Sequence, residues 1–184
     1  MKTRILAKMF VVFVWMGAAL AKPGVEVVWQ VESKSGFSAP NLVMDARTER
    51  TLGIVVCEHH TGVVCFDLAG QRLWAYALTP PVTASPAVAD VNGDGREDIV
   101  AADAKGLLVA LADDGKLLWK AQLPAEVAAD SCPAIVDLDG DSHVEIVVGD
   151  TSGTVSCLDN AGNVLWRFTG DGTTMGPAMA ADVY

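Results

Sequence analysis

The sequence has few charged residues, and basic residues are fewer than acidic ones. Charged residues make up 20% of its 184 residues, with 13 Lys and Arg against 23 Asp and Glu, and the formal net charge is −10. A nucleic-acid site needs a basic face, so this balance excludes nucleic acid as a partner and argues against docking on anionic lipid. The apolar content of 51% is too high for a disordered chain.

The sequence also lacks the common motifs of catalytic, phosphate-binding and zinc sites. The sequence has no G-x-S-x-G, no H-E-x-x-H, no phosphate-cradling glycine loop and no C-x-x-C pair, so we assign no catalytic residue and no zinc site. His59 and His60 are adjacent, and we interpret them as the tip of a solvated loop in preference to a metal site. Beyond residue 21 the chain shows no helical periodicity.

The N-terminus has the three parts of a secretory signal peptide. Lys2, Arg4 and Lys8 precede an apolar run over residues 9–21, which closes with an A-x-A site at Ala21. We therefore expect residues 1–21 to be removed, leaving residues 22–184 as a secreted or periplasmic chain with no membrane span. The alternative is an uncleaved anchor, but the run falls short of the roughly 20 apolar residues that a spanning helix needs.

A repeat runs through the rest of the chain. Its clearest marker is a tryptophan at intervals of 45, 45 and 47 residues, namely Trp29, Trp74, Trp119 and Trp166. Prolines keep the same register at intervals of 46, 47 and 44 residues, namely Pro40, Pro86, Pro133 and Pro177. Independent markers in one register establish an internal repeat, which is the signature of a modular architecture.

Each unit reads as four short strands with turns between them. The strands expected in the second unit are 85–91, 98–103, 107–112 and 116–123. This pattern predicts an all-β fold, a β-propeller of four-stranded antiparallel blades. The expected blades are 38–79, 84–124 and 130–170, with the start of another at 175–184. Propellers usually close with about 4–8 blades, so we interpret the sequence as an incomplete propeller and part of a longer protein. The alternative is an open three-blade stack shielded by a partner.

The loop after the first strand of the second unit has the pattern of a calcium site. Oxygen side chains stand at alternate positions, Asp90, Asn92 and Asp94, and Asp98 returns a further carboxylate. A hard cation takes six to eight oxygen ligands, and alternate residues of a tight loop converge on one point. Arg96 would contribute its backbone carbonyl. The alternative is a solvated Asp/Gly turn.

The third unit repeats this loop. Its expected ligands are Asp137, Asp139, Asp141, the backbone carbonyl of His143, and Glu145. Two Ca²⁺ sites are therefore predicted. In the first unit the aligned stretch is 45–53, which has two arginines and no closing carboxylate, so we expect no calcium there.

Two stretches carry a family resemblance. Residues 85–95 (SPAVADVNGDG), followed by Asp98-Ile99-Val100, closely resemble the FG-GAP/VCBS-type repeat of integrin α-subunit propellers and many secreted bacterial proteins. Residues 155–166 (VSCLDNAGNVLW) are similar to the tryptophan-docking repeat of quinoprotein-like (PQQ-like) propellers. The resemblance covers residues 24–184 and implies a propeller with calcium loops. It implies little about function, because one fold hosts many activities.

We interpret the repeated tryptophans and the cysteines as residues that stabilise the fold. We expect the tryptophans to pack between blades, with each indole N–H finding a partner there. If Gly62 ends a three-residue hairpin loop, Cys57 and Cys65 fall opposite each other and could form a disulfide. Otherwise they are small buried core residues, as the matching positions of Cys65 and Cys157 in different units favour.

Together these features predict a calcium-binding propeller repeat protein that acts as a binding or scaffold module for a protein or glycan partner. The alternative is the N-terminal part of a propeller enzyme, either a PQQ-type quinoprotein dehydrogenase or a calcium-dependent polysaccharide lyase. The sequence shows no convergent acid, base or cofactor clamp, and it lacks the vicinal cysteine pair of some quinoprotein dehydrogenases, so bound PQQ is not expected.

Overall fold

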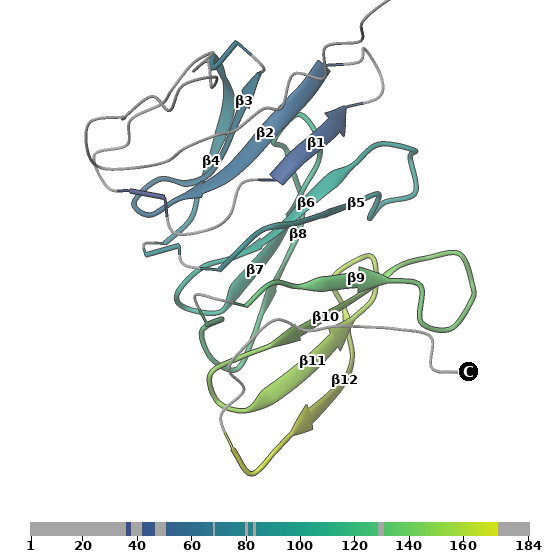
Figure 1. Ribbon diagram of the computed structural model, residues 1–184. Helices are drawn as coiled ribbons and strands as arrows, with labels where there is room; N and C mark the ends of the chain where they lie inside the picture. The colour runs from purple at the N-terminus through teal and green to yellow at the C-terminus, as the bar shows by residue number, and fades with distance from the viewer. Residues whose placement is uncertain are drawn as a thin grey trace, which may run out of the picture.

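The computed structural model describes residues 36–37, 42–46, 51–67, 69–79, 81–82, 84–128 and 131–172. The expected signal peptide, Trp29 and the expected start of a fourth blade lie outside these residues. The prediction of an all-β propeller architecture is confirmed: in these residues twelve strands form three antiparallel sheets of four strands each (Figure 1). Within the described residues no helix has the length and apolar character to span a membrane.

Each sheet is one blade, in which four consecutive strands pair with their neighbours in chain order. Blade 1 consists of β1 (Leu42–Ala46), β2 (Thr51–Glu58), β3 (Gly62–Asp67) and β4 (Arg72–Ala77). Blade 2 consists of β5 (Ala87–Ala89), β6 (Asp98–Ala102), β7 (Leu107–Leu111) and β8 (Leu117–Gln122). Blade 3 consists of β9 (Ala134–Val136), β10 (Glu145–Gly149), β11 (Thr154–Leu158) and β12 (Val164–Thr169). The strands expected in the second unit are all present, although the first is shorter than its sequence pattern indicates.

The hydrophobic core lies between the blades. Side chains of a strand alternate between its two faces, and a middle strand of blade 2 is apolar on both. Ile99 and Ala101 of β6 pack in a cluster with blade 1, whereas Val100 and Ala102 pack in a cluster with blade 3. The outer strands β4 and β8 instead alternate between exposed and half-buried residues. Each blade is therefore stabilised mainly by its neighbours, as in other repeat proteins.

The prediction that the tryptophans pack between blades is confirmed for two of them. Trp74 of β4 donates its indole N–H to the backbone oxygen of Asp113 in blade 2, at 2.9 Å. Trp119 of β8 donates in the same way to Asn160 in blade 3, at 2.8 Å. A buried indole needs a partner for its N–H, and the turn of the next blade supplies it both times.

The expected alignment of Cys57 with Cys65 is wrong. In the β2–β3 pairing Cys57 lies opposite Val63, and Cys65 lies opposite Val55. The hairpin closes at the pair Glu58 and Gly62, so Gly62 begins β3, and each β2 residue pairs two residues earlier in β3 than expected. All four cysteines are free thiols, and three of them are buried. The interpretation as small core residues is the one that the structure supports.

Candidate metal loops

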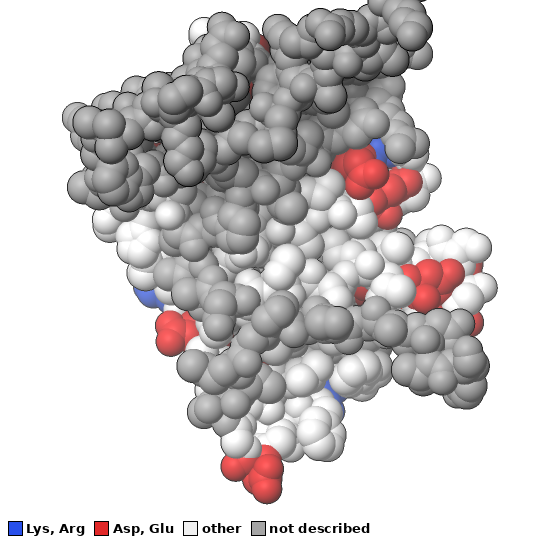
Figure 2. Space-filling model, viewed as in Figure 1, with Lys and Arg blue, Asp and Glu red and all other residues white. Residues whose placement is uncertain are grey.

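Two loops of the same construction connect the first and second strands of blades 2 and 3. In each, the first Asp follows directly after a short strand, and the closing acid is the first residue of the next strand. The register fixes that acid at the base of the loop, because Asp98 pairs with Ala89 and Glu145 pairs with Val136. Figure 2 shows acidic patches on the side of the molecule where Figure 1 places these loops.

The loop of blade 2 is folded around its own carboxylates. The two oxygens of Asp90 accept hydrogen bonds from the backbone N–H groups of Gly93 and Gly95, at 2.8 and 2.9 Å. One oxygen of Asp98 accepts from the N–H groups of Val91 and Asn92, at 3.0 and 3.1 Å. These bonds turn the acidic side chains inward and hold the loop in shape without a flanking helix.

Asp98 is the most unusual residue of this loop. It is 1% exposed, and its Oδ1 has no hydrogen-bond partner within the described part of the structure. Burial raises the pKa of its carboxyl to about 6, although the backbone hydrogen bonds from Asn92 and Val91 lower it; the nearby charges of Asp94 and Asp90 raise it further. A buried carboxylate oxygen without a partner is costly, and a cation in the loop would supply the missing contact.

Asp94, a third acid of this loop, has a partner within the protein. Asp94 Oδ2 lies 3.0 Å from the guanidinium of Arg96, which also reaches Asp113 at 3.5 Å. Desolvation raises the pKa of Asp94, but the hydrogen bonds from Arg96 outweigh it and hold that pKa below its usual value. The side chain of Arg96 was expected to play no part, so this ion pair is a finding of the structure.

The loop of blade 3 repeats three of these hydrogen bonds at equivalent positions. Asp137 accepts from the N–H groups of Gly140 and Ser142, at 2.7 and 3.0 Å. Glu145 accepts from the N–H of Leu138 at 2.7 Å, as Asp98 does from Val91 in blade 2. Two blades thus build one kind of loop from different sequences.

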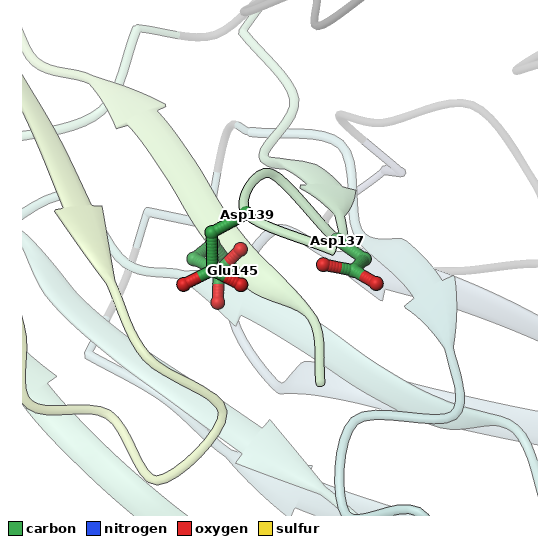
Figure 3. Close-up of side chains that lie close together, drawn as sticks. All are labelled: Asp137, Asp139 and Glu145. Atoms are coloured by element: carbon green, nitrogen blue, oxygen red, sulfur yellow. The ribbon is translucent and has the colours of Figure 1, made fainter. Parts of the chain in front are cut away.

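The carboxylates of blade 3 come closer together than those of blade 2. Asp137, Asp139 and Glu145 each offer an oxygen within 4.8 Å of the others (Figure 3). Among the described residues this is the one group of three acidic, His or Cys side chains that meets this distance. Asp141 does not belong to the group: it lies 3.3 Å from the His143 ring and accepts the His143 N–H, which lowers its pKa.

Ser142 takes the backbone conformation that its glycine counterpart takes. Its φ is 72°, the one non-glycine positive φ among the described residues, and Gly95 in the blade 2 loop has φ 84°. A side chain in this left-handed region costs roughly 1–2 kcal/mol. The loop therefore keeps its turn despite the substitution, and it does so at the expense of local strain.

Two buried acids outside the loops were not singled out from the sequence. Asp103 and Asp150 are buried and follow the second strand of their blades. Asp103 accepts from the N–H of Thr79 in the preceding chain segment at 3.3 Å, and Asp150 from that of Ala125 at 3.2 Å. Their separation of 47 residues matches the repeat and is the signal that could have revealed them. Through these hydrogen bonds, each Asp connects its own repeat to the end of the preceding one.

The histidine pair lies where a loop tip was expected. His59 and His60 occupy the turn between β2 and β3, with ring centroids 5.1 Å apart and edge to face. Among the described residues neither takes part in a group of three metal-binding side chains.

Comparison with known families identifies the repeat. Residues 59–183 match the family model described as outer membrane protein assembly factor BamB. The chain belongs to this BamB family. This confirms the quinoprotein-like part of the resemblance, while the FG-GAP/VCBS part stays a prediction. A comparison with curated protein sequences gave no match.

Solved structures similar to this BamB-family chain share its fold at low sequence identity. BamB from Moraxella catarrhalis is 16% identical with a TM-score of 0.56, over 77% of this chain and 39% of its own. The V. cholerae biofilm matrix protein Bap1 is 22% identical with a TM-score of 0.57, over 76% and 21%. A quinohemoprotein alcohol dehydrogenase from Comamonas testosteroni is 17% identical with a TM-score of 0.52, over 72% and 21%. The chain thus spans less than half the length of each.

Proposed function

We propose that this chain is an exported, calcium-stabilised β-propeller repeat module that binds a protein or glycan partner. The observation that carries the calcium proposal is the buried carboxylate of Asp98, whose Oδ1 lacks a partner in the described structure at the base of an acidic loop. The group formed by Asp137, Asp139 and Glu145 supports a second site. Carboxylates and backbone carbonyls are the ligands that calcium prefers.

Several features of the loops favour calcium over smaller or softer cations. The ligands on offer are oxygens, with no cysteine at either loop. Calcium accepts six to eight oxygens in flexible geometry, whereas Mg²⁺ demands a near-ideal octahedron and gives up its water reluctantly. Asp90, Asn92, Asp94 and the Arg96 carbonyl would complete the blade 2 site, and Asp141 and the His143 carbonyl would complete that of blade 3. This ligand set is the one that the resemblance to FG-GAP/VCBS-type calcium loops implies.

The binding role rests on the architecture and on the proteins that share it. Stacked blades present rigid loops, and calcium would fix those loops in place. The family's described member is an assembly factor and Bap1 is a biofilm matrix protein, which favours a scaffold or binding role over catalysis. The identity of the partner is left to experiment. Export follows from the expected signal peptide, and N-terminal sequencing of the secreted or periplasmic protein should begin at Lys22.

Thermal unfolding with and without calcium tests the metal proposal. At a hundredfold excess of Ca²⁺ over its dissociation constant, one site adds about 2.7 kcal/mol to the free energy of unfolding. We expect a lower melting temperature in chelator that Ca²⁺ restores and Mg²⁺ does not. An unchanged melt in the three conditions would refute the proposal.

Two matched substitutions distinguish the loss of a calcium ligand from the loss of a negative charge. Asp98→Asn should melt at or above the wild-type temperature in chelator, because a neutral amide replaces a buried charge, and should lose much of the calcium gain. Glu97→Gln removes the same charge from the neighbouring position, which is not an expected ligand, and should keep the gain. Equal calcium responses in these two variants would contradict the assignment of Asp98 as a ligand.

The enzyme alternative stays a prediction with its own tests. The likeness to a quinohemoprotein alcohol dehydrogenase is a likeness of fold. Adding pyrroloquinoline quinone and recording its bound absorbance tests the dehydrogenase. Incubation with pectic polysaccharide, followed by the absorbance of unsaturated products, tests the lyase.

A further inference from the structure

The loop of blade 2 contains an asparagine followed directly by a glycine. Asn92 and Gly93 are both exposed in the loop between β5 and β6. Within the described structure no atom lies within 4 Å of the position that a Cβ on Gly93 would take. The backbone nitrogen of Gly93 is therefore open to the side chain of the residue before it. In the sequence this is the one Asn-Gly pair.

This pair of residues has the chemistry of spontaneous deamidation. The backbone nitrogen of Gly93 attacks Cγ of the Asn92 side chain, and the Cγ–Nδ2 bond breaks. The leaving nitrogen takes up the proton that the Gly93 nitrogen gives up, and it departs as ammonia. Water then opens the five-membered succinimide, at one carbonyl to aspartate and at the other to isoaspartate. Because nucleophile and carbonyl belong to adjacent residues, no second molecule has to be oriented for the ring to close.

The hydrogen bonds of the loop assist the attack. The N–H of Gly93 donates to Oδ1 of Asp90 at 2.8 Å, and this carboxylate can accept the proton that the attacking nitrogen loses. Oδ1 of Asn92 accepts the N–H of Asp94 at 2.8 Å, which places a donor on the oxygen where negative charge develops. The metal-free loop thus holds the reacting groups with a proton acceptor and an oxyanion donor beside them.

Blade 3 carries an acid where blade 2 carries this amide. Asp139 precedes a glycine and stands two residues after Asp137. Asn92 stands in the same place relative to Asp90. The aspartate product in blade 2 would therefore have the side chain that blade 3 places in its group of three acids. The isoaspartate product would instead insert one more backbone atom between the alternate oxygen side chains of the loop.

We propose that Asn92 is a deamidation site that calcium protects. Calcium in the loop would hold Oδ1 of Asn92 and the carboxylate of Asp90, because both are expected ligands. The Asn92 side chain would then be fixed away from the Gly93 nitrogen, and that nitrogen would lose its proton acceptor. The reaction itself needs only this chain and water, whereas the protection rests on the proposed calcium site. A chain kept without calcium would thus change its own loop irreversibly.

Incubation of the folded chain at mildly alkaline pH, with chelator in one sample and Ca²⁺ in the other, tests this proposal. Mass spectrometry of the digested protein measures the remaining amide at Asn92, and chromatography separates the aspartate and isoaspartate peptides. We expect progressive loss of the amide in chelator and its retention in calcium. Asn163, which is exposed but precedes a valine, is the internal control and should stay intact in both samples.

Two matched glycine variants show whether the Gly93 nitrogen is the nucleophile. Gly93→Ala and Gly95→Ala each place a methyl group at an exposed position of positive φ, 77° and 84°, with no described atom within 4 Å. In chelator Gly93→Ala should keep the Asn92 amide, because its methyl group shields the attacking nitrogen. Gly95→Ala has the same kind of backbone strain and should lose the amide like the wild type. Circular dichroism checks that both variants are folded.

Four outcomes would overturn the proposal. An Asn92 amide that stays intact in chelator excludes the reaction, and loss at Asn163 at the same rate shows that the Asn-Gly pair is not its cause. Loss from Gly93→Ala as fast as from Gly95→Ala excludes attack by the Gly93 nitrogen. Equal loss with and without Ca²⁺ excludes the protection, and the thermal melts in Ca²⁺ and chelator then show whether the proposed calcium site fails with it.

Discussion

The packing of Trp119 on Gly162 can be tested by adding one methyl group. In Gly162→Ala the new Cβ would stand 2.7 Å from two ring atoms of Trp119, at a residue whose φ is 83°. Positive φ costs an alanine roughly 1–2 kcal/mol, and forcing a methyl into a packed contact costs roughly 1–3 kcal/mol more. The free energy of unfolding should therefore fall by about 2–5 kcal/mol, a large part of the ~5–15 kcal/mol of an ordinary domain.

Gly93→Ala supplies the control for the backbone term. Gly93 has φ 77°, and no atom lies within 4 Å of its added Cβ, so only the strain of roughly 1–2 kcal/mol applies. Urea unfolding in chelator, which removes any metal effect from the Gly93 loop, compares the two variants. In a Trp119→Ala background the cost of Gly162→Ala should fall to that of Gly93→Ala, since the ring has gone. Equal costs in the wild-type background would refute the docking of Trp119 on this turn.

Three further substitutions follow from the same contacts. Ser142→Gly should raise the stability of the metal-free chain by up to about 1 kcal/mol, because glycine relieves the positive φ but gains freedom in the unfolded state; a loss of stability would contradict this. Trp119→Phe should cost about 1–2 kcal/mol by leaving the Asn160 carbonyl without its donor, and a neutral result in urea unfolding would mean that the bond contributes nothing. Asp150→Ala should cost at least about 3 kcal/mol, since a buried carboxylate that accepts several hydrogen bonds is lost, and hydrogen exchange at Ala125 should report the opening.

The sequence predicts those features that recur at the same position in every repeat. Trp74 and Trp119 stand in one register, and a repeat forces equal positions into equal surroundings, so their role between blades followed from spacing alone. The same logic was available for Asp103 and Asp150, whose separation matches the repeat. Residue type alone does not distinguish them, because an Asp before a glycine turn is also an ordinary turn residue.

The sequence does not predict features that depend on the register of a hairpin or on a neighbour distant in sequence. Cys57 and Cys65 were misaligned because Gly62 begins a strand instead of ending the loop, and a shift of this kind changes every pairing partner. The side chain of Arg96 was assigned no role, yet it contacts Asp113, which lies 17 residues away and approaches only when the β7–β8 turn folds back.

Arg96 would be a weak competitor of calcium in the blade 2 loop. Its guanidinium holds one oxygen of Asp94, an expected ligand, so it competes with a metal for that carboxylate. Both side chains are well exposed, at 40% and 35%, and water screens such pairs so strongly that they contribute little. A dication that also satisfies the buried Asp98 gains far more, because it compensates a charge that water does not reach. Calcium should therefore displace Arg96 from Asp94, and the freed guanidinium would keep Asp113, the residue whose carbonyl holds Trp74, as its remaining partner. Arg96 therefore links the metal loop to Asp113, the residue whose backbone carbonyl accepts the indole N–H of Trp74.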